Sequence, residues 1–305
     1  MKIFRRRRPW TNDDFVGARV KIPVTCESTA GATSLAWARV LAAAILGEPH
    51  ESTEHRARFV LSAGSDMVAP VDLVQLIGPE RLAFLRQMAL VPLDWTNVVP
   101  QVRPGDDVVV LVHGFCATAG VFRPLRARLE TEAGARVATF THAPGVGVRR
   151  IARQLERLID RLPASARITV VGHSLGGVVA RWYVQEMGGH RRVVRTISMA
   201  SPFSGVAVPP LLVGVDLHEQ SALLKRLREG ARSCGVPHTS IVAGLDTVVP
   251  GTGTACLGAG DVLVMPQCGH NELLFDAAVA QIVIDRVRRS RGTDRRPLPG
   301  ARAAL

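Results

Sequence analysis

The chain has 305 residues, of which 47% are apolar and 21% charged, and its formal net charge is +12. This composition allows one large α/β domain with additional elements, and no apolar run reaches the roughly 18 uncharged residues expected of a transmembrane helix. Residues 1–8 carry five positive charges and residues 286–305 a net six, so the body between them is nearly neutral. We therefore expect no specific nucleic-acid site, and we interpret the basic ends as solvated tails or as a peripheral contact with an anionic membrane.

The start of the chain and its cysteines both favour a cytoplasmic protein. The opening MKIFRRRRPW is followed by polar TNDD, where a signal peptide would need an apolar core. Five cysteines without a CxxC pair argue against a zinc site and against a dense disulfide framework. We expect reduced thiols, although Cys234 and Cys256 could pair in an exported protein. The sequence does not indicate an oligomeric state.

The first hundred residues differ in character from the rest. Helix-like patches at residues 35–46 and 70–89 are separated by loops, and few strands are evident. The segment QVRPGDD combines proline, glycine and charge just before an apolar strand, as domain boundaries do. We predict an N-terminal helical extension of unknown role over residues 1–105, a catalytic domain over 106–290, and a basic disordered tail over 291–305.

Strands and helices alternate from residue 108 onward. Such alternation predicts a mostly parallel sheet with helices on both faces, and active sites in such sheets lie at the carboxyl ends of the strands. The predicted strands are residues 108–113, 136–140, 167–171, 193–199, 238–244 and 261–266, and the predicted helices are residues 120–132, 148–162, 175–187 and 272–289.

One serine lies at a junction between a strand and a helix. Ser174, in VVGHSLGGVV, follows the β-branched run RITVV and precedes a segment of helical spacing. Strand, Gly-x-Ser-x-Gly and helix form the context of a nucleophile elbow, in which Gly172 and Gly176 allow the strand and the helix to approach each other. The helix N-terminus also favours developing negative charge. We predict that Ser174 is a nucleophile, the alternative being an ordinary tight turn.

A serine nucleophile needs a histidine base, which in this context follows the serine and an acid along the chain. His270 lies just after the last predicted strand, in a loop at its carboxyl end. His238 begins a strand and so lies at the opposite edge, His218 lies in an amphipathic segment, and His190 borders a turn. We predict that His270 is the base.

The acid should also follow a strand. Asp246 closes the strand of SIVAGLDTVVP and precedes His270 by 24 residues. Asp261 starts a strand, at the wrong edge of the sheet, and Asp216 precedes a helix-like segment. We predict Asp246, with Asp216 as the second candidate.

An oxyanion hole requires two backbone N–H groups aimed at the developing charge. One is expected from Leu175, directly after the nucleophile, and the other from Phe115 in the loop HGFCAT after the first strand. His113 would brace this loop and take no part in the chemistry.

These motifs together resemble the α/β-hydrolase superfamily, in particular bacterial lipases and related esterases. The resemblance rests on GHSLGG, HGF, GLDTVVP and CGHNELL and covers about residues 106–290. SMASPFSGVAV stands where those lipases carry Gly-Thr-Pro-His-x-Gly and keeps the proline and the second glycine, and DLHEQSALLKRL resembles the segment before their lid.

The resemblance implies an α/β-hydrolase fold with a short lid insertion over residues 202–235, and hydrolysis of carboxylic esters through an acyl-enzyme, with no metal or organic cofactor. We expect a lipid-like ester substrate, because Leu217, Leu223, Leu224 and Leu227 recur at helical spacing as an apolar lid face would. A packed core helix would show the same leucines. A thioesterase or an acyltransferase would share the triad, and a non-catalytic binding protein with this fold is the alternative of another class.

Overall fold

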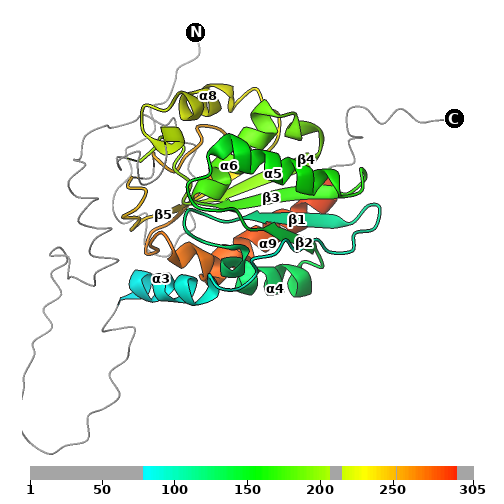
Figure 1. Ribbon diagram of the computed structural model, residues 1–305, viewed down its shortest axis with the longest axis horizontal. Coiled ribbons are helices and arrows are strands. Elements are labelled where there is room, and N and C mark those ends of the chain that lie inside the picture. The colour runs from blue at the N-terminus through cyan, green and yellow to red at the C-terminus, as the bar shows by residue number, and fades with distance from the viewer. Residues whose placement is uncertain (1–77, 207–214, 252, 294–305) are drawn as a thin grey trace, which may run out of the picture.

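The computed structural model describes residues 78–206, 215–251 and 253–293. Their centre is a sheet of six parallel strands in the order β2-β1-β3-β4-β5-β6 (Figure 1). The strand order reverses between β1 and β3, and in open α/β sheets the crevice at the carboxyl ends there is the usual place for a site. The strands are β1 (Asp107–Val112), β2 (Arg136–Phe140), β3 (Arg167–His173), β4 (Val193–Met199), β5 (His238–Ala243) and β6 (Asp261–Met265).

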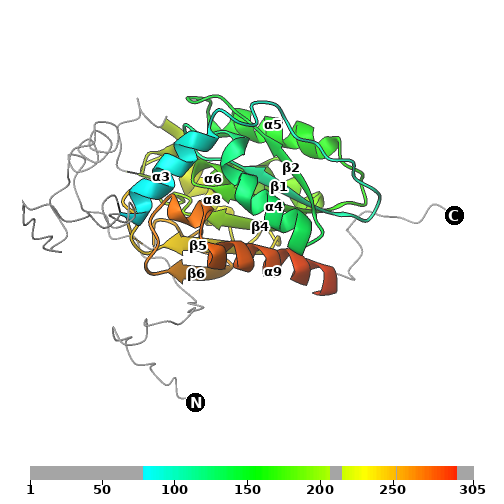
Figure 2. The ribbon, with the colours of Figure 1, turned by 90° about the horizontal axis from the view of Figure 1, so that it is seen from below.

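Helices cover both faces of the sheet. Helices α5 (Val148–Asp160), α6 (Leu175–Glu186) and α8 (Ala222–Gly230) lie on one face, and α4 (Arg123–Glu132) and α9 (Ala277–Thr293) lie on the other (Figures 1 and 2). Short 3-10 turns complete the described chain: η2 (Ala119–Phe122), η3 (Gly189–Arg191), η4 (Val215–Leu217) and η5 (Glu272–Leu274).

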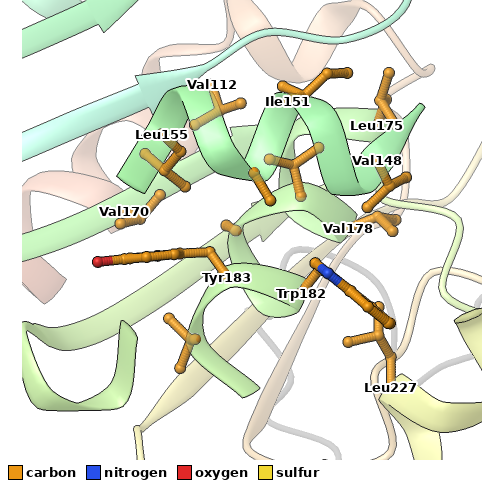
Figure 3. Packing of buried hydrophobic residues seen from close by; sticks show 14 of the residues in the cluster. Val112, Val148, Ile151, Leu155, Val170, Leu175, Val178, Trp182, Tyr183 and Leu227 are labelled. Carbon is orange, nitrogen blue, oxygen red and sulfur yellow. The ribbon is translucent and has the colours of Figure 1, made fainter. Parts of the chain in front are cut away.

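Each of the five buried residues of β1 packs against one of two cores. Val108, Val110 and Val112 join the core under α5 and α6, whereas Val109 and Leu111 join the core under α4 and α9. Figure 3 shows the first of these cores, where side chains of α5 and α6 interdigitate above the sheet. Because both faces are buried, the strand reads as an unbroken apolar run, and each such side chain contributes about 1.5–3 kcal/mol by leaving water.

The end of the predicted N-terminal extension is attached to the catalytic body. Helix α3 (Pro79–Leu90) begins with a proline, which is compatible with the first helical turn, and it contacts both η2 and η5. Farther on, Val98 forms an antiparallel bridge with Thr139 of β2, with both N–O distances at 2.9 Å. Residues 79–98 therefore cover one end of the sheet and extend its β2 edge.

The predicted α/β architecture is confirmed, with two local differences. Helix α4 starts only at Arg123, after η2, because Pro124 occupies its first turn. The predicted last helix is divided into η5 and α9, since the Asp276 carboxylate accepts a 2.8 Å hydrogen bond from the Val279 N–H and so caps a new helix.

The leucines assigned to a lid are buried in the described part of that region. Leu223, Leu224 and Leu227 of α8 belong to the core that includes Trp182 of α6, and the Leu227 carbonyl accepts a 2.9 Å hydrogen bond from Gln185. Residues 222–230 therefore form a packed core helix, which is the alternative to a lid face. The apolar run at residues 207–214 lies outside the described residues.

Other predictions concern features absent from the described residues, or segments that lie outside them. No disulfide joins Cys234 to Cys256 in the described residues. Among these residues, no helix is long and apolar enough to cross a membrane. The patch at residues 35–46, the basic residues 1–8 and the end of the basic tail lie outside them.

Candidate active site

Ser174 occupies a sharp turn between β3 and α6. Its φ of 52° and ψ of −121° are an unusual conformation for a residue with a side chain, and α6 begins at the next residue. The Ser174 N–H donates a 2.8 Å hydrogen bond to the Met199 carbonyl at the end of β4, which fixes the turn to the neighbouring strand. The side chain is partly exposed at the carboxyl edge of the sheet.

The glycines around Ser174 are required by close backbone approaches. A Cβ atom at Gly172 would overlap the backbone of Gly176, and one at Gly176 would overlap the carbonyl oxygen of Val112 in β1. A Cβ at Gly177 would overlap the hydroxyl of Ser201. The first turn of α6 therefore sits directly against β1 and β3, and this contact forces the strained conformation at Ser174.

His270 and Asp246 form a buried pair beside the elbow. The His270 Nδ1–H donates a 2.8 Å hydrogen bond to Asp246 Oδ2. The other carboxylate oxygen, Oδ1, accepts hydrogen bonds from the N–H groups of Val248 at 2.8 Å and Val249 at 2.7 Å. Asp246 is therefore held by its own loop, and it fixes the His270 tautomer that leaves Nε2 as the basic nitrogen.

Two opposing effects determine the pKa of His270. Burial lowers it, but the charge and hydrogen bond of Asp246, with a further contribution from the charge of Glu80, outweigh burial and raise the pKa above 6.5. A raised pKa makes the unprotonated His270 ring a stronger base toward a serine hydroxyl.

His173 links the loop of His270 to the elbow. Its Nε2–H donates a 3.1 Å hydrogen bond to the His270 carbonyl, and the two rings lie 4.9 Å apart. Burial lowers the pKa of His173 to about 3, so its ring is neutral and acts as a fixed donor. The predicted base is thereby attached to the residue that precedes the predicted nucleophile.

The loop after β1 lies against Ser174. A Cβ at Gly114 would come 3.1 Å from the Ser174 Cβ, so the backbone of this loop passes close to the nucleophile. Within the described residues, the backbone N–H groups of Phe115 and Leu175 donate no hydrogen bond. Phe115 and Leu175 also line a common cavity of about 20 Å³. Unpaired N–H groups beside a nucleophile are one requirement of an oxyanion hole.

Two stacked histidines pack against the loop after β1. The rings of His113 and His142 lie 3.8 Å apart and nearly parallel. His113 Nε2 accepts a 3.0 Å hydrogen bond from the His142 N–H, so its proton is on Nδ1, which donates to the Gly114 carbonyl at 2.8 Å. Burial lowers the pKa of His113 to about 3 and keeps the ring neutral. His113 thus braces the loop, as its sequence position predicts.

Comparison with known proteins finds a similar family over part of this region, ending before Asp246 and His270. A family model described as palmitoyl protein thioesterase matches residues 108–243, which include the loop of Phe115 and the elbow of Ser174. The described residues have the α/β-hydrolase fold. No curated protein sequence matches the chain.

Solved structures similar to this chain share its fold at low sequence identity. Lipase B of Aspergillus fumigatus is 17% identical, with a TM-score of 0.52 over 63% of this chain and 55% of its own. A putative aryl esterase of Burkholderia cenocepacia is 15% identical, with a TM-score of 0.50 over 64% of this chain and 94% of its own.

The other candidates of the sequence make no hydrogen bond with Ser174 or His270 within the described residues, although Asp216 lines the cavity that Phe115 and Leu175 share. The Asp216 carboxylate accepts a 2.8 Å hydrogen bond from the Val148 N–H at the start of α5. His238 is buried at the amino edge of β5 and interacts with Thr196 and Ser198. Within the described residues, no cluster of histidine, cysteine and acidic side chains could hold a metal ion.

Sequence reasoning missed one charged residue near the base. Glu80, at the start of α3, accepts hydrogen bonds from the backbone of Asn271 and Glu272, next to His270. It lies about 190 residues away along the chain. In the sequence, Glu80 is recognisable only as an acidic residue in the first turn of a helix. Such a residue normally indicates a favourable interaction with the helix dipole and not a contact with a catalytic loop.

Proposed function

We propose that the protein is a serine hydrolase that cleaves carboxylic esters or thioesters through an acyl-enzyme. The observation that carries this proposal is the 2.8 Å hydrogen bond of His270 to Asp246, in a loop tied to the strained turn of Ser174. An activated serine nucleophile requires a histidine oriented by a charged partner and a backbone turn that exposes the serine hydroxyl.

The proposed reaction uses only groups of the chain. Ser174 Oγ attacks the substrate carbonyl while His270 Nε2 takes its proton, and the N–H groups of Phe115 and Leu175 stabilise the oxyanion. His270 then protonates the leaving alcohol or thiol as the bond to the carbonyl carbon breaks. Water, deprotonated by the same histidine, cleaves the acyl-enzyme and regenerates Ser174. Asp246 stabilises the imidazolium that forms in both halves.

Lipid-like acyl groups are the proposed substrates. The cavity beside Phe115 and Leu175 is lined by the apolar side chains of Val146, Val148 and Leu217 and by Asp216, whose carboxylate is engaged by the Val148 N–H. A thioester is the second candidate for the scissile bond, because the matching family model describes palmitoyl protein thioesterases. In either case the acyl group would be held by apolar contacts, which suit hydrocarbon and not a charged acid.

The proposal is tested by covalent labelling. A fluorophosphonate should react with Ser174, and mass spectrometry of the labelled peptide should locate the adduct there. The variant Ser174→Ala should neither be labelled nor hydrolyse p-nitrophenyl butyrate. Full activity of Ser174→Ala would exclude the proposed nucleophile and leave the fold as a binding protein.

The substrate class is tested by matched substrates. Values of kcat/KM for p-nitrophenyl esters from butyrate to dodecanoate, and for the corresponding acyl thioesters, should increase with chain length. Anionic vesicles should increase the rate further if the basic ends of the chain hold the enzyme at a lipid surface. A preference for butyrate, unchanged by vesicles, would instead indicate an esterase for small soluble substrates.

A further inference from the structure

One segment of the N-terminal region contacts both loops that the proposed reaction needs. The start of α3 meets the loop that carries His270, and its end meets η2, just after the loop that carries Phe115. Figure 2 shows α3 lying across this end of the molecule, beside the turn that precedes α9. A helix that contacts both loops can set their separation.

Glu80 holds the loop of the base. Its Oε1 accepts hydrogen bonds from the Asn271 backbone N–H at 2.9 Å and from the Asn271 Nδ2 at 2.7 Å. Its Oε2 accepts from the backbone N–H groups of Asn271 at 3.0 Å and Glu272 at 3.1 Å. A carboxylate that accepts from several donors fixes the two peptide groups directly after His270.

The other end of α3 holds the loop of the oxyanion hole. The Thr118 hydroxyl lies 2.8 Å from the Val91 carbonyl and 3.0 Å from the Leu93 carbonyl, where α3 ends. A Cβ at Gly120 would overlap the carbonyl oxygen of Leu90, so the two backbones are in direct contact. These contacts leave little freedom for either segment to move independently of the other.

We propose that Glu80 is a positioning residue, which holds His270 in its reactive place and adds negative charge beside it. This inference rests on the proposed function, because it assigns Glu80 a role only through a catalytic His270. It also assigns a role to α3, which acts as a strut between the base and the oxyanion hole. On this view, part of the N-terminal region belongs to the catalytic unit.

The charges around His270 predict in which direction the pKa of His270 should change when Glu80 is replaced. His270 is faced by Asp246 from the loop after β5, by Glu80 from α3, and by neutral His173 from β3. Glu80 is faced in turn by His270, by the Asn271 side chain, by the backbone N–H groups of Asn271 and Glu272, and by Cys268. Burial raises the pKa of Glu80, and its hydrogen bonds and the charge of His270 oppose this rise. The Glu272 carboxylate accepts a hydrogen bond from the Gly269 N–H. Since the charge of Glu80 raises the pKa of His270, its removal should lower that pKa.

The experiment compares Glu80→Gln, which keeps the shape and removes the charge, with Glu80→Asp, which keeps the charge and shortens the reach. Glu80→Gln should lower kcat for a p-nitrophenyl ester by about 10- to 100-fold with little change in KM. It should also move the acidic limb of the kcat/KM profile to lower pH. Glu80→Asp should lower kcat but leave that limb near its original place. Glu130→Gln, an exposed glutamate on α4, is the matched control and should match the unmodified chain.

Folding of each full-length variant is checked by thermal denaturation. If Glu80→Gln does not fold, Glu80→Asp is the deciding variant: a lower kcat with an unmoved acidic limb supports the positioning role of Glu80, and an unchanged kcat overturns that role. If Glu80→Gln folds and keeps both its kcat and its acidic limb, the positioning role is also overturned. The proposed function would survive that result, because Ser174→Ala would still be inactive. Activity of Ser174→Ala, in contrast, would overturn the proposed function itself.

Discussion

The two sides of the candidate site are built in different ways. The nucleophile side is local: Ser174 and its glycines lie within six residues, and their backbone contacts determine the turn. The base side is assembled over long range, because His270 depends on Asp246 from another loop and on Glu80 from α3. The electrostatics differ as well, since neutral buried histidines surround the elbow and carboxylates surround the base.

This difference has a consequence for mutation. The elbow is sensitive chiefly to its own glycines and to the few strand residues, such as Val112 and Met199, that contact it. The position of His270, in contrast, should be sensitive to a change in any residue that holds its loop, including residues of α3 that do not contact the substrate. The predictions below test this contrast, beginning with the largest expected effect.

The first prediction tests whether the nucleophile Ser174 and the base His270 act as one catalytic unit. His270→Ala should lower kcat about as much as Ser174→Ala, each by about 10⁶-fold, and the double variant should be little worse, because the two residues act as one unit. Steady-state kinetics on an activated ester measure all three. Multiplicative losses in the double variant would mean that the two sides act independently, contrary to the proposed mechanism.

The second prediction concerns the acid on the base side. Asp246→Asn keeps the shape of the side chain but cannot stabilise the imidazolium, and it should lower kcat by about 10⁴-fold. Asp216→Asn tests the second candidate: the Asp216 carboxylate lines the cavity of Phe115 and Leu175, but it accepts from the Val148 N–H and makes no hydrogen bond with His270 within the described residues, so kcat should change far less. The reverse result would show that Asp216 is the acid.

The third prediction isolates the nucleophile side. Gly176→Ala would place a methyl group on the Val112 carbonyl oxygen, and it should lower the free energy of unfolding by about 3 kcal/mol. Gly230→Ala is the control, because its methyl group meets only the movable end of Gln185 at 3.0 Å. It should change stability by about 1 kcal/mol or less. Denaturant titration of both variants measures the difference, and equal effects would contradict the tight contact at the elbow.

The smallest predicted effect concerns the neutral histidines. The pKa of His113 is about 3 in the folded chain, and its unfolded value is about 6.5. Between these values the unfolded chain binds a proton that the folded chain does not, so stability falls as pH falls. The slope is about 1.4 kcal/mol per pH unit for each such histidine. His270 contributes with the opposite sign, since its folded pKa is raised and its contribution is lost as pH rises above 6.5.

The measurement is the free energy of unfolding between pH 6 and pH 4. His113→Asn should show a shallower fall with decreasing pH than the unmodified chain, whatever its stability at pH 7. An unchanged slope would mean that His113 is protonated in the folded protein.

Much of the fold could be predicted from the sequence because its signals are local. The strands are β-branched runs bounded by turn residues, and the alternation with helices leaves a parallel sheet as the arrangement that buries both faces. The boundaries of α4 and α9 were less accurate, since Pro124 and the capping side chain of Asp276 divide segments whose apolar spacing is continuous. The lid assignment of Leu223, Leu224 and Leu227 illustrates the same limit, because helical spacing does not distinguish a lid from a helix packed on α6.

The sequence by itself determined the elbow and the order of Ser174, Asp246 and His270, since each follows a strand whose end is readable from local pattern. Only the tertiary structure decided that His270 bonds to Asp246, that Asp216 caps α5, and that Glu80 reaches the loop of the base. The physical reason is that a hydrogen bond depends on distance in space, and a contact across 190 residues leaves no periodic trace in the chain.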